Sequence, residues 1–183
     1  MDCLLSHELK KGTFSISRKM DCFSCHHPME TSSCQDCHQV QSRMFSGEAV
    51  LNYQATPDVM SFSLGCGECH VELEQGKTKE RVREACGNCH DENYAEMMDQ
   101  WQEEVSAQIN SIKGKIENLK EALDRSKESQ ETEESLRSAL EYSEVRLSLV
   151  EKDGSQGGHN YVLISEMLED AASRLEDAEQ LIQ

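Results

Sequence analysis

The sequence has 183 residues, of which 37% are hydrophobic and only 5% are aromatic; these are low fractions for a chain whose core consists of side chains alone. The formal net charge of −17 argues against nucleic acid as a partner, because such a partner requires a basic face. No stretch approaches the roughly 18 consecutive apolar residues that a transmembrane helix needs, so we predict no membrane-spanning segment.

Residues 1–94 contain all nine cysteines. Every cysteine except Cys3 belongs to a C-x-x-C pair, and a histidine directly follows each pair. The four motifs are Cys22-x-x-Cys25-His26, Cys34-x-x-Cys37-His38, Cys66-x-x-Cys69-His70 and Cys86-x-x-Cys89-His90. Short connections separate most of them, so whatever the motifs bind should lie close together and supply the core that side chains do not.

Three kinds of site use paired cysteines: zinc sites, disulfide frameworks and haem attachment through C-x-x-C-H. The pairs Cys66/Cys69 and Cys86/Cys89 do have the spacing of a zinc ribbon. In haem attachment two thiolates bond to the porphyrin, and the next residue's imidazole binds the iron from the same side. Histidine is 7 of 183 residues, so four chance placements have a probability of roughly 2 in a million. We therefore predict four covalent c-type haems.

The haem irons need axial ligands, and the motif histidines His26, His38, His70 and His90 are the predicted proximal ones. The remaining histidines are candidates for the distal sides: His7, His27 and His159. The fourth iron is left to a methionine (Met29, Met44 and Met60 are examples), to a histidine from another segment or subunit, or to five-coordination. An open iron binds and reduces small molecules, whereas a six-coordinate iron relays electrons.

The first residues contain a fifth, incomplete motif. Cys3-Leu4-Leu5-Ser6-His7 has serine in place of the second cysteine. It is either a coincidence or the relic of a haem site, and we count four haems rather than five. The start also lacks the basic end and long apolar stretch of a secretory signal.

Residues 95–183 show three amphipathic stripes with helical spacing. Their members are Val105, Ile109, Ile112, Ile116, Leu119 and Leu123; Leu136, Leu140, Ser143, Leu147 and Val150; and Ile164, Leu168, Ala171, Leu175, Ala178 and Ile182. The polar run 126–134 and the glycine-rich run 153–158 separate them. We predict a mostly α fold, in which a haem-cored first half with little regular structure precedes a long antiparallel helical hairpin. A third helix, beginning at His159, is expected to fold back onto the haem half.

The chain resembles the C-terminal part of multihaem cytochromes c related to pentahaem nitrite reductase and octahaem hydroxylamine oxidoreductase. The residues that carry the resemblance are Cys34–His38 through Pro57 and Met60 to Cys66–His70, then Cys86–His90 with Tyr94, Met98 and Trp101, and finally Gly158-His159-Asn160-Tyr161. His26-His27 is similar to the C-x-x-C-H-H of class III cytochromes c, where the second histidine serves a neighbouring haem. The resemblance implies a chain of haems with long C-terminal helices, often used for dimerisation.

The resemblance does not imply catalysis. Nitrite reductases typically hold their active haem through C-x-x-C-K, which this sequence lacks, and no tyrosine can be assigned to the haem cross-link of hydroxylamine oxidoreductases. We predict an electron-transfer cytochrome; the alternative is a fragment of a reductase acting on nitrite, hydroxylamine or a sulfur oxyanion at a five-coordinate haem. We expect a periplasmic or extracellular location, an N-terminally truncated chain, redox partners with basic docking patches, and possible self-association through the C-terminal helices.

Overall fold

The computed structural model describes residues 33–48, 51, 53, 56–70, 78–91, 93–125 and 129–182. The helices in these ranges are α1 (Cys34–Cys37), α2 (Gln39–Ser46), the 3₁₀ helix η3 (Val59–Phe62), α3 (Cys66–Cys69), α4 (Thr78–Cys86), α5 (Asn93–Arg125), α6 (Gln130–Asp153) and α7 (Tyr161–Gln180). The prediction of a mostly α fold is confirmed. The chain divides into two compact units, Met1–Gln39 and Val40–Gln183.

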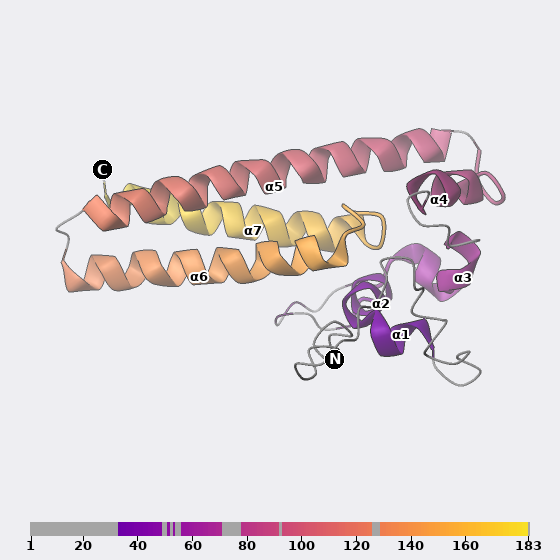
Figure 1. Cartoon of the computed structure of the whole chain (residues 1–183), viewed down its shortest axis with the longest axis horizontal. Coiled ribbons are helices and arrows are strands. Elements are labelled where there is room, and N and C mark those ends of the chain that lie inside the picture. Colours follow the sequence, from indigo (N-terminus) through magenta and orange to yellow (C-terminus); the bar gives the residue numbers. More distant parts are fainter. Residues whose placement is uncertain are drawn as a thin grey trace, which may run out of the picture. The chain divides into compact units, whose positions relative to one another are not determined.

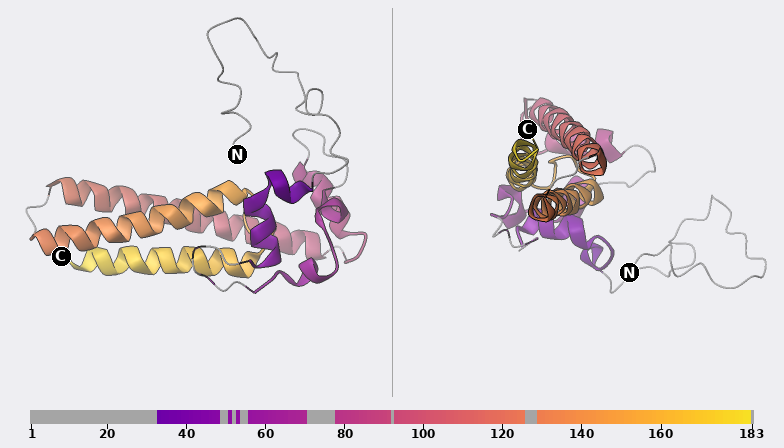
Figure 2. Two further views of the ribbon diagram at one scale, coloured as in Figure 1. Left: turned by 90° about the horizontal axis from the view of Figure 1, so that it is seen from below. Right: turned by 90° about the vertical axis from the view of Figure 1, so that its left-hand side faces the viewer.

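Three long helices of the second unit, α5, α6 and α7, run side by side as a bundle, which Figures 1 and 2 show from the side and from one end. The hairpin of α5 and α6 and the final helix α7 lie where the apolar stripes predict them. No helix in the described part of the chain is both long and apolar enough to cross a bilayer.

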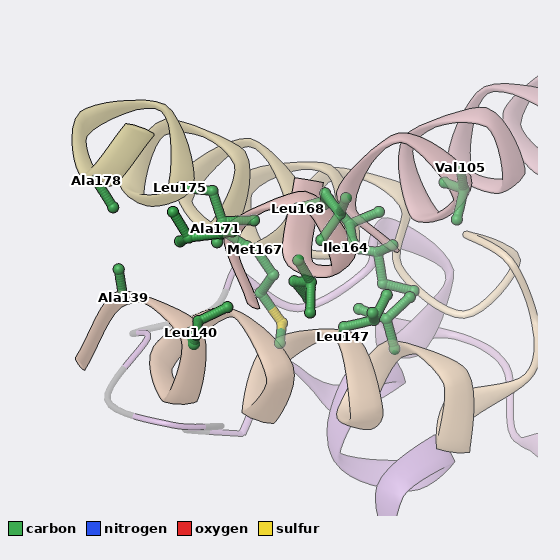
Figure 3. Close-up of a cluster of buried hydrophobic side chains, with 14 of the residues drawn as sticks. Val105, Ala139, Leu140, Leu147, Ile164, Met167, Leu168, Ala171, Leu175 and Ala178 are labelled. Atoms are coloured by element: carbon green, nitrogen blue, oxygen red, sulfur yellow. The ribbon is translucent and has the colours of Figure 1, made fainter. Parts of the chain in front are cut away.

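The core of the second unit consists of the three predicted stripes, packed against one another (Figure 3). All six positions of the third stripe, five of them in α7, are in this core or against it, and Ile164, Leu168, Ala171 and Leu175 have no exposed surface. Ser143, the polar member of the second stripe, is also fully buried. Its hydroxyl donates to the Ala171 carbonyl at 3.1 Å, which offsets the cost of removing the hydroxyl from water. The chain therefore buries its stripes within itself, while self-association stays a prediction.

Capping side chains set the ends of α6 and α7. Ser129 caps α6 by accepting from the Thr132 N–H at 3.3 Å, so this helix begins at Gln130, inside the polar run that we expected to interrupt it. Asn160 caps α7 by accepting from the Leu163 N–H at 3.1 Å. The helix consequently begins at Tyr161 rather than at His159, which lies in the preceding turn.

Two side-chain amides tie the region around α2 to the turn between α6 and α7. Asn160, 3% exposed, donates from Nδ2 to the carbonyls of Met44 and Thr56 at 3.0 and 2.9 Å. Gln41 donates from Nε2 to the Lys152 carbonyl at 2.8 Å. These contacts pair the buried amide of Asn160 and link the turn before α7 to the α2 region.

Gly157 in this turn is required for two reasons. Its φ of 101° is unfavourable for other residues, and an added Cβ would lie 3.2 Å from Tyr161 Cδ2 and 3.4 Å from Val105 Cγ2. We expect Gly157→Ala to lower the free energy of unfolding by about 1–2 kcal/mol for the backbone and by roughly a further 1–3 kcal/mol for overpacking. Gly154→Ala is the control, because φ there is 72° but the nearest atom is 3.9 Å away. Equal losses in urea unfolding would contradict the packing argument.

A cluster of polar side chains joins Tyr53 to α6 and α7. The hydroxyls of Tyr53 and Tyr142 both donate to Asp170 Oδ2, and Arg146 donates from Nε to the Tyr53 hydroxyl at 2.9 Å. The Arg146 guanidinium carbon also lies 3.2 Å from the centre of the Tyr142 ring, a cation–π contact. The hydrogen bonds from Tyr142 and Tyr53 lower the pKa of Asp170, while burial and then the bond to Asp170 raise the pKa of Tyr53.

The lowered pKa of Asp170 gives stability that depends on pH. This contribution is complete above the unfolded-state pKa of about 4 and is lost as the pH falls through the lower pKa of the folded state. We expect Asp170→Asn to reduce stability at neutral pH and to flatten its decline on the acid side, as measured by thermal unfolding from pH 7 to pH 2. Glu166→Gln, on an exposed position of the same helix, should leave the acid limb unchanged.

Candidate functional site

Three of the four C-x-x-C-H motifs lie in the described residues, and all three form the same turn. The N–H groups of His38, His70 and His90 donate to the carbonyls of Cys34, Cys66 and Cys86, each at 2.9 Å. A bond from residue i+4 to residue i closes one helical turn, and residues at i, i+3 and i+4 of such a turn lie on one face. Each turn therefore presents two thiols and one imidazole on the same side.

A carboxylate inside the motif fixes two of these turns. The Asp36 carboxylate accepts from the Ser33 N–H at 2.8 Å, and the Glu68 carboxylate accepts from the Gly65 N–H at 2.8 Å. Each acid stands directly before the second cysteine and reaches back to the residue before the first cysteine. The acid thereby satisfies an N–H that the short helix leaves unpaired, which stabilises a turn too short to persist alone.

The third described turn is built differently. Cys86 is the last residue of α4, and Gly87, Asn88 and Cys89 continue with bonds of 3.1, 3.1 and 3.2 Å to carbonyls three residues back. The nine-residue helix α4 leads directly into this motif, so the first cysteine needs no capping carboxylate. His90 then stacks on Tyr94 of the first turn of α5, with ring centres 4.0 Å apart and planes 20° apart.

The thiols of the last two motifs lie near one another. Burial raises the pKa of Cys69, and the negative charges of Cys86 and Glu68 raise it further. Burial also raises the pKa of Cys86. Among the described residues, however, no three or more His, Cys, Asp or Glu side chains converge as the ligands of one metal ion.

His159 lies in the turn between α6 and α7 and is held by a buried carboxylate. Its Nδ1 lies 2.7 Å from Asp153 Oδ1, and the Asp153 side chain has no exposed surface. An ionised carboxylate can only accept, so a neutral His159 ring in this contact carries its proton on Nδ1 and offers the lone pair of Nε2. This is the tautomer in which histidine binds a metal through Nε2.

The imidazoles of His70 and His159 lie together, although the two residues are far apart in the sequence. Their ring centres are 6.0 Å apart, and the planes are inclined by 50°. With metal–nitrogen bonds of about 2 Å, two imidazoles on opposite sides of one iron have ring centres roughly 6 Å apart. The pair therefore has the separation that bis-histidine ligation of one haem iron requires.

Apolar side chains are exposed directly before the α3 motif. Val59 and Phe62 of η3 are 79% and 75% exposed, and the capping carboxylate of Asp58 accepts from the Met60 N–H at 2.9 Å to fix this short helix. Large exposed apolar side chains are surfaces that a flat apolar group bound at the Cys66–His70 turn would cover.

Several predicted residues lie outside the described part of the chain: Cys3, His7, Cys22, Cys25, His26, His27 and Met29. The structure places Met44 in the hydrophobic core with no exposed surface, which makes it a packing residue rather than a ligand. Met60 lies half-buried in η3. Of the three distal candidates, His159 lies in the described residues, and it lies beside His70. The sequence does not reveal that these two segments meet.

Sequence reasoning missed Asp153, which it treated only as part of a helix stop. A signal was present. An acid in the last turn of a helix faces the partial negative charge of the free carbonyls and is unfavourable there, so Asp153 directly before the glycine stop requires a compensating partner. The structure supplies two, Ser155 and His159.

Comparisons with known proteins give a fold but no family. No protein-family model matches the sequence, and no curated protein matches it. The structure is similar to the crystal structure of the outer cell wall cytochrome OcwA, with a TM-score of 0.58 and 22% sequence identity over 78% of this chain and 34% of that one. The chain thus spans about a third of the length of OcwA, with which it shares a fold.

Proposed function

We propose that this chain is a multihaem c-type cytochrome that transfers electrons outside the cytoplasm. The observation that carries the proposal is the common turn, since three separate segments present two thiols and an imidazole on one face. Thioethers would form at Cys34/Cys37, Cys66/Cys69, Cys86/Cys89 and, by the same motif, Cys22/Cys25, with His38, His70, His90 and His26 as proximal ligands. When bound, each haem supplies one-electron chemistry between ferric and ferrous iron.

The pair of His70 and His159 supports a relay rather than a substrate-binding iron for the haem of the Cys66–His70 motif. His70 and His159 would together hold this iron, and an iron held by two imidazoles would relay electrons rather than bind a small molecule. The protein's part is to fix both rings and to exclude water from the iron.

The likeness to an outer cell wall cytochrome supports the cytochrome assignment and a location outside the cytoplasm. The net charge of −17 favours redox partners with basic docking surfaces, and such encounters weaken as the salt concentration rises. Exposed Val59 and Phe62 support haem packing at the α3 motif.

The proposal is tested by expressing the chain with a c-type maturation system. We expect the pyridine haemochrome assay to give four haems per chain, one for each motif of the sequence. Electron paramagnetic resonance should show the haem of His70 and His159 as low-spin. A protein that matures without haem and keeps reduced thiols would overturn the proposal. A high-spin haem whose spectrum responds to nitrite would instead favour a reductase.

Replacing Cys66 and Cys69 with serine should remove one haem. We expect the count to fall by one and the other haems to remain, because each turn forms from its own local hydrogen bonds. Cys3→Ser is the matched control and should leave the count unchanged. A lower count in Cys3→Ser would show that the incomplete motif also carries a haem.

A further inference from the structure

We propose that Asp153 is a positioning residue that orients His159 toward the haem iron and lowers the reduction potential of that haem. The inference rests on the proposed function and adds a residue that tunes one of its haems. It depends on a contact between two side chains that no haem motif contains: His159 Nδ1 and Asp153 Oδ1, 2.7 Å apart.

The environment of Asp153 shows that the contact has an energetic cost that must be offset. The side chain has no exposed surface. Asp153 is also the last residue of α6, where the helix dipole opposes a negative charge. A buried carboxylate without partners is strongly unfavourable. Each of its oxygens is therefore satisfied: Oδ1 by His159, and Oδ2 by the N–H of Ser155 at 3.1 Å and by the Ser155 hydroxyl.

Ser155 contacts both members of the Asp153–His159 pair. Its hydroxyl oxygen accepts from the His159 N–H at 3.1 Å while the hydroxyl donates to Asp153. The His159 backbone and ring are thus both tied to the same carboxylate. Gly154, in the left-handed conformation with φ of 72°, turns the chain so that this ring of contacts closes.

The turn is anchored from outside as well. Gln41 donates to the Asp153 carbonyl at 3.2 Å, and Asn160, directly after His159, donates to two carbonyls of the α2 region. The Asp153–His159 pair therefore cannot rotate freely. A rigid second partner of this kind fixes the tautomer and the ring orientation of a metal-binding histidine.

The direction of the effect on the haem follows from charge. A carboxylate that accepts the Nδ1 proton makes the imidazole a stronger electron donor through Nε2. A stronger donor stabilises ferric iron more than ferrous iron, because the ferric ion carries the larger positive charge. The reduction potential of this haem is consequently lower than that of the same haem with a neutral partner on His159.

A purely structural role of Asp153 would lead to different results. If Asp153 only ended α6, its replacement would change the stability of the bundle and leave the haem spectrum and potential alone. If only net charge mattered, removal of a neighbouring carboxylate would have the same effect. Glu151 provides this comparison, since it lies two residues away, pairs with Lys113 at 2.7 Å and is 44% exposed.

The experiment compares Asp153→Asn, Glu151→Gln and Ser155→Ala with the parent, all matured with haem. Spectroelectrochemical titration measures the potentials, electron paramagnetic resonance measures the spin state, and far-ultraviolet circular dichroism checks the bundle. In Asp153→Asn we expect all haems to remain attached and the potential of one haem to become more positive. Glu151→Gln should leave that potential unchanged. Ser155→Ala should shift it the other way, because the carboxylate loses a competing donor.

Equal shifts in Asp153→Asn and Glu151→Gln, or no shift in Asp153→Asn, would overturn the inference. If Asp153→Asn loses its helical signal, Ser155→Ala decides alone: a more negative potential supports the inference, and an unchanged or more positive one rejects it. The parent separates this result from the proposed function. A parent without haem rejects the function, whereas a haem-loaded parent with insensitive potentials rejects only the role of Asp153.

Discussion

Replacing His159 with alanine is expected to convert one ferric haem from low-spin to high-spin without changing the number of attached haems. Attachment depends on the cysteines and the proximal histidine of each motif, which the substitution does not touch. The ring of His159 lies 6.0 Å from that of His70, centre to centre, so its loss would leave one iron with a single strong-field ligand. Electron paramagnetic resonance and the pyridine haemochrome assay measure the two quantities separately.

Added imidazole is the control for this variant. A free imidazole should enter the vacated side of the iron and restore the low-spin signal, whereas the parent should not respond. Cyanide should bind this haem in the variant and should not bind it in the parent. An unchanged low-spin spectrum in His159→Ala would mean that the distal ligand of this haem comes from elsewhere in the chain.

The helical bundle could be predicted because its signal is local. The spacing of residues such as Ile112, Leu140 and Leu168 specifies one apolar face on each helix, and the glycines after Asp153 specify where the chain must turn. Three helices with one apolar face each, joined by short connections, bury these faces by packing them against one another. The start of α6 was placed too late, since a single serine cap at Ser129 outweighs the polarity of the residues that follow it.

The candidate site was only half predictable. The C-x-x-C-H spacing is a chemical constraint on neighbouring residues and can be read directly. The pairing of His70 with His159 depends instead on how α3 and the turn before α7 lie in the folded unit, which no local pattern encodes. Asp153 left a trace in the sequence, but its partner could be chosen only once the turn through Ser155 was known.

Leu168→Ala is expected to have the largest effect on stability. Leu168 has no exposed surface and lies at the centre of the core between the three long helices (Figure 3). Its truncation should lower the free energy of unfolding by about 2–5 kcal/mol, and the urea midpoint should fall by about 1 M or more. Circular dichroism at 222 nm measures this transition. Val162→Ala, at a position of the same helix that is 60% exposed, should cost less than about 0.5 kcal/mol.

This variant also tests whether the bundle and the haem region act as one unit. His159 directly precedes Asn160, the residue that caps α7, and Asn160 bonds to the α2 region. Unfolding of the bundle should therefore withdraw His159 from its iron. The loss of the low-spin signal and the loss of helical signal should occur at the same urea concentration, and Leu168→Ala should move both by the same amount. A low-spin signal that outlasts the helical signal would show that the ligand does not depend on the bundle. Coincident transitions would mean that the acidic helices affect the haem although they carry none of the C-x-x-C-H motifs. They would do so by stabilising the turn that holds His159.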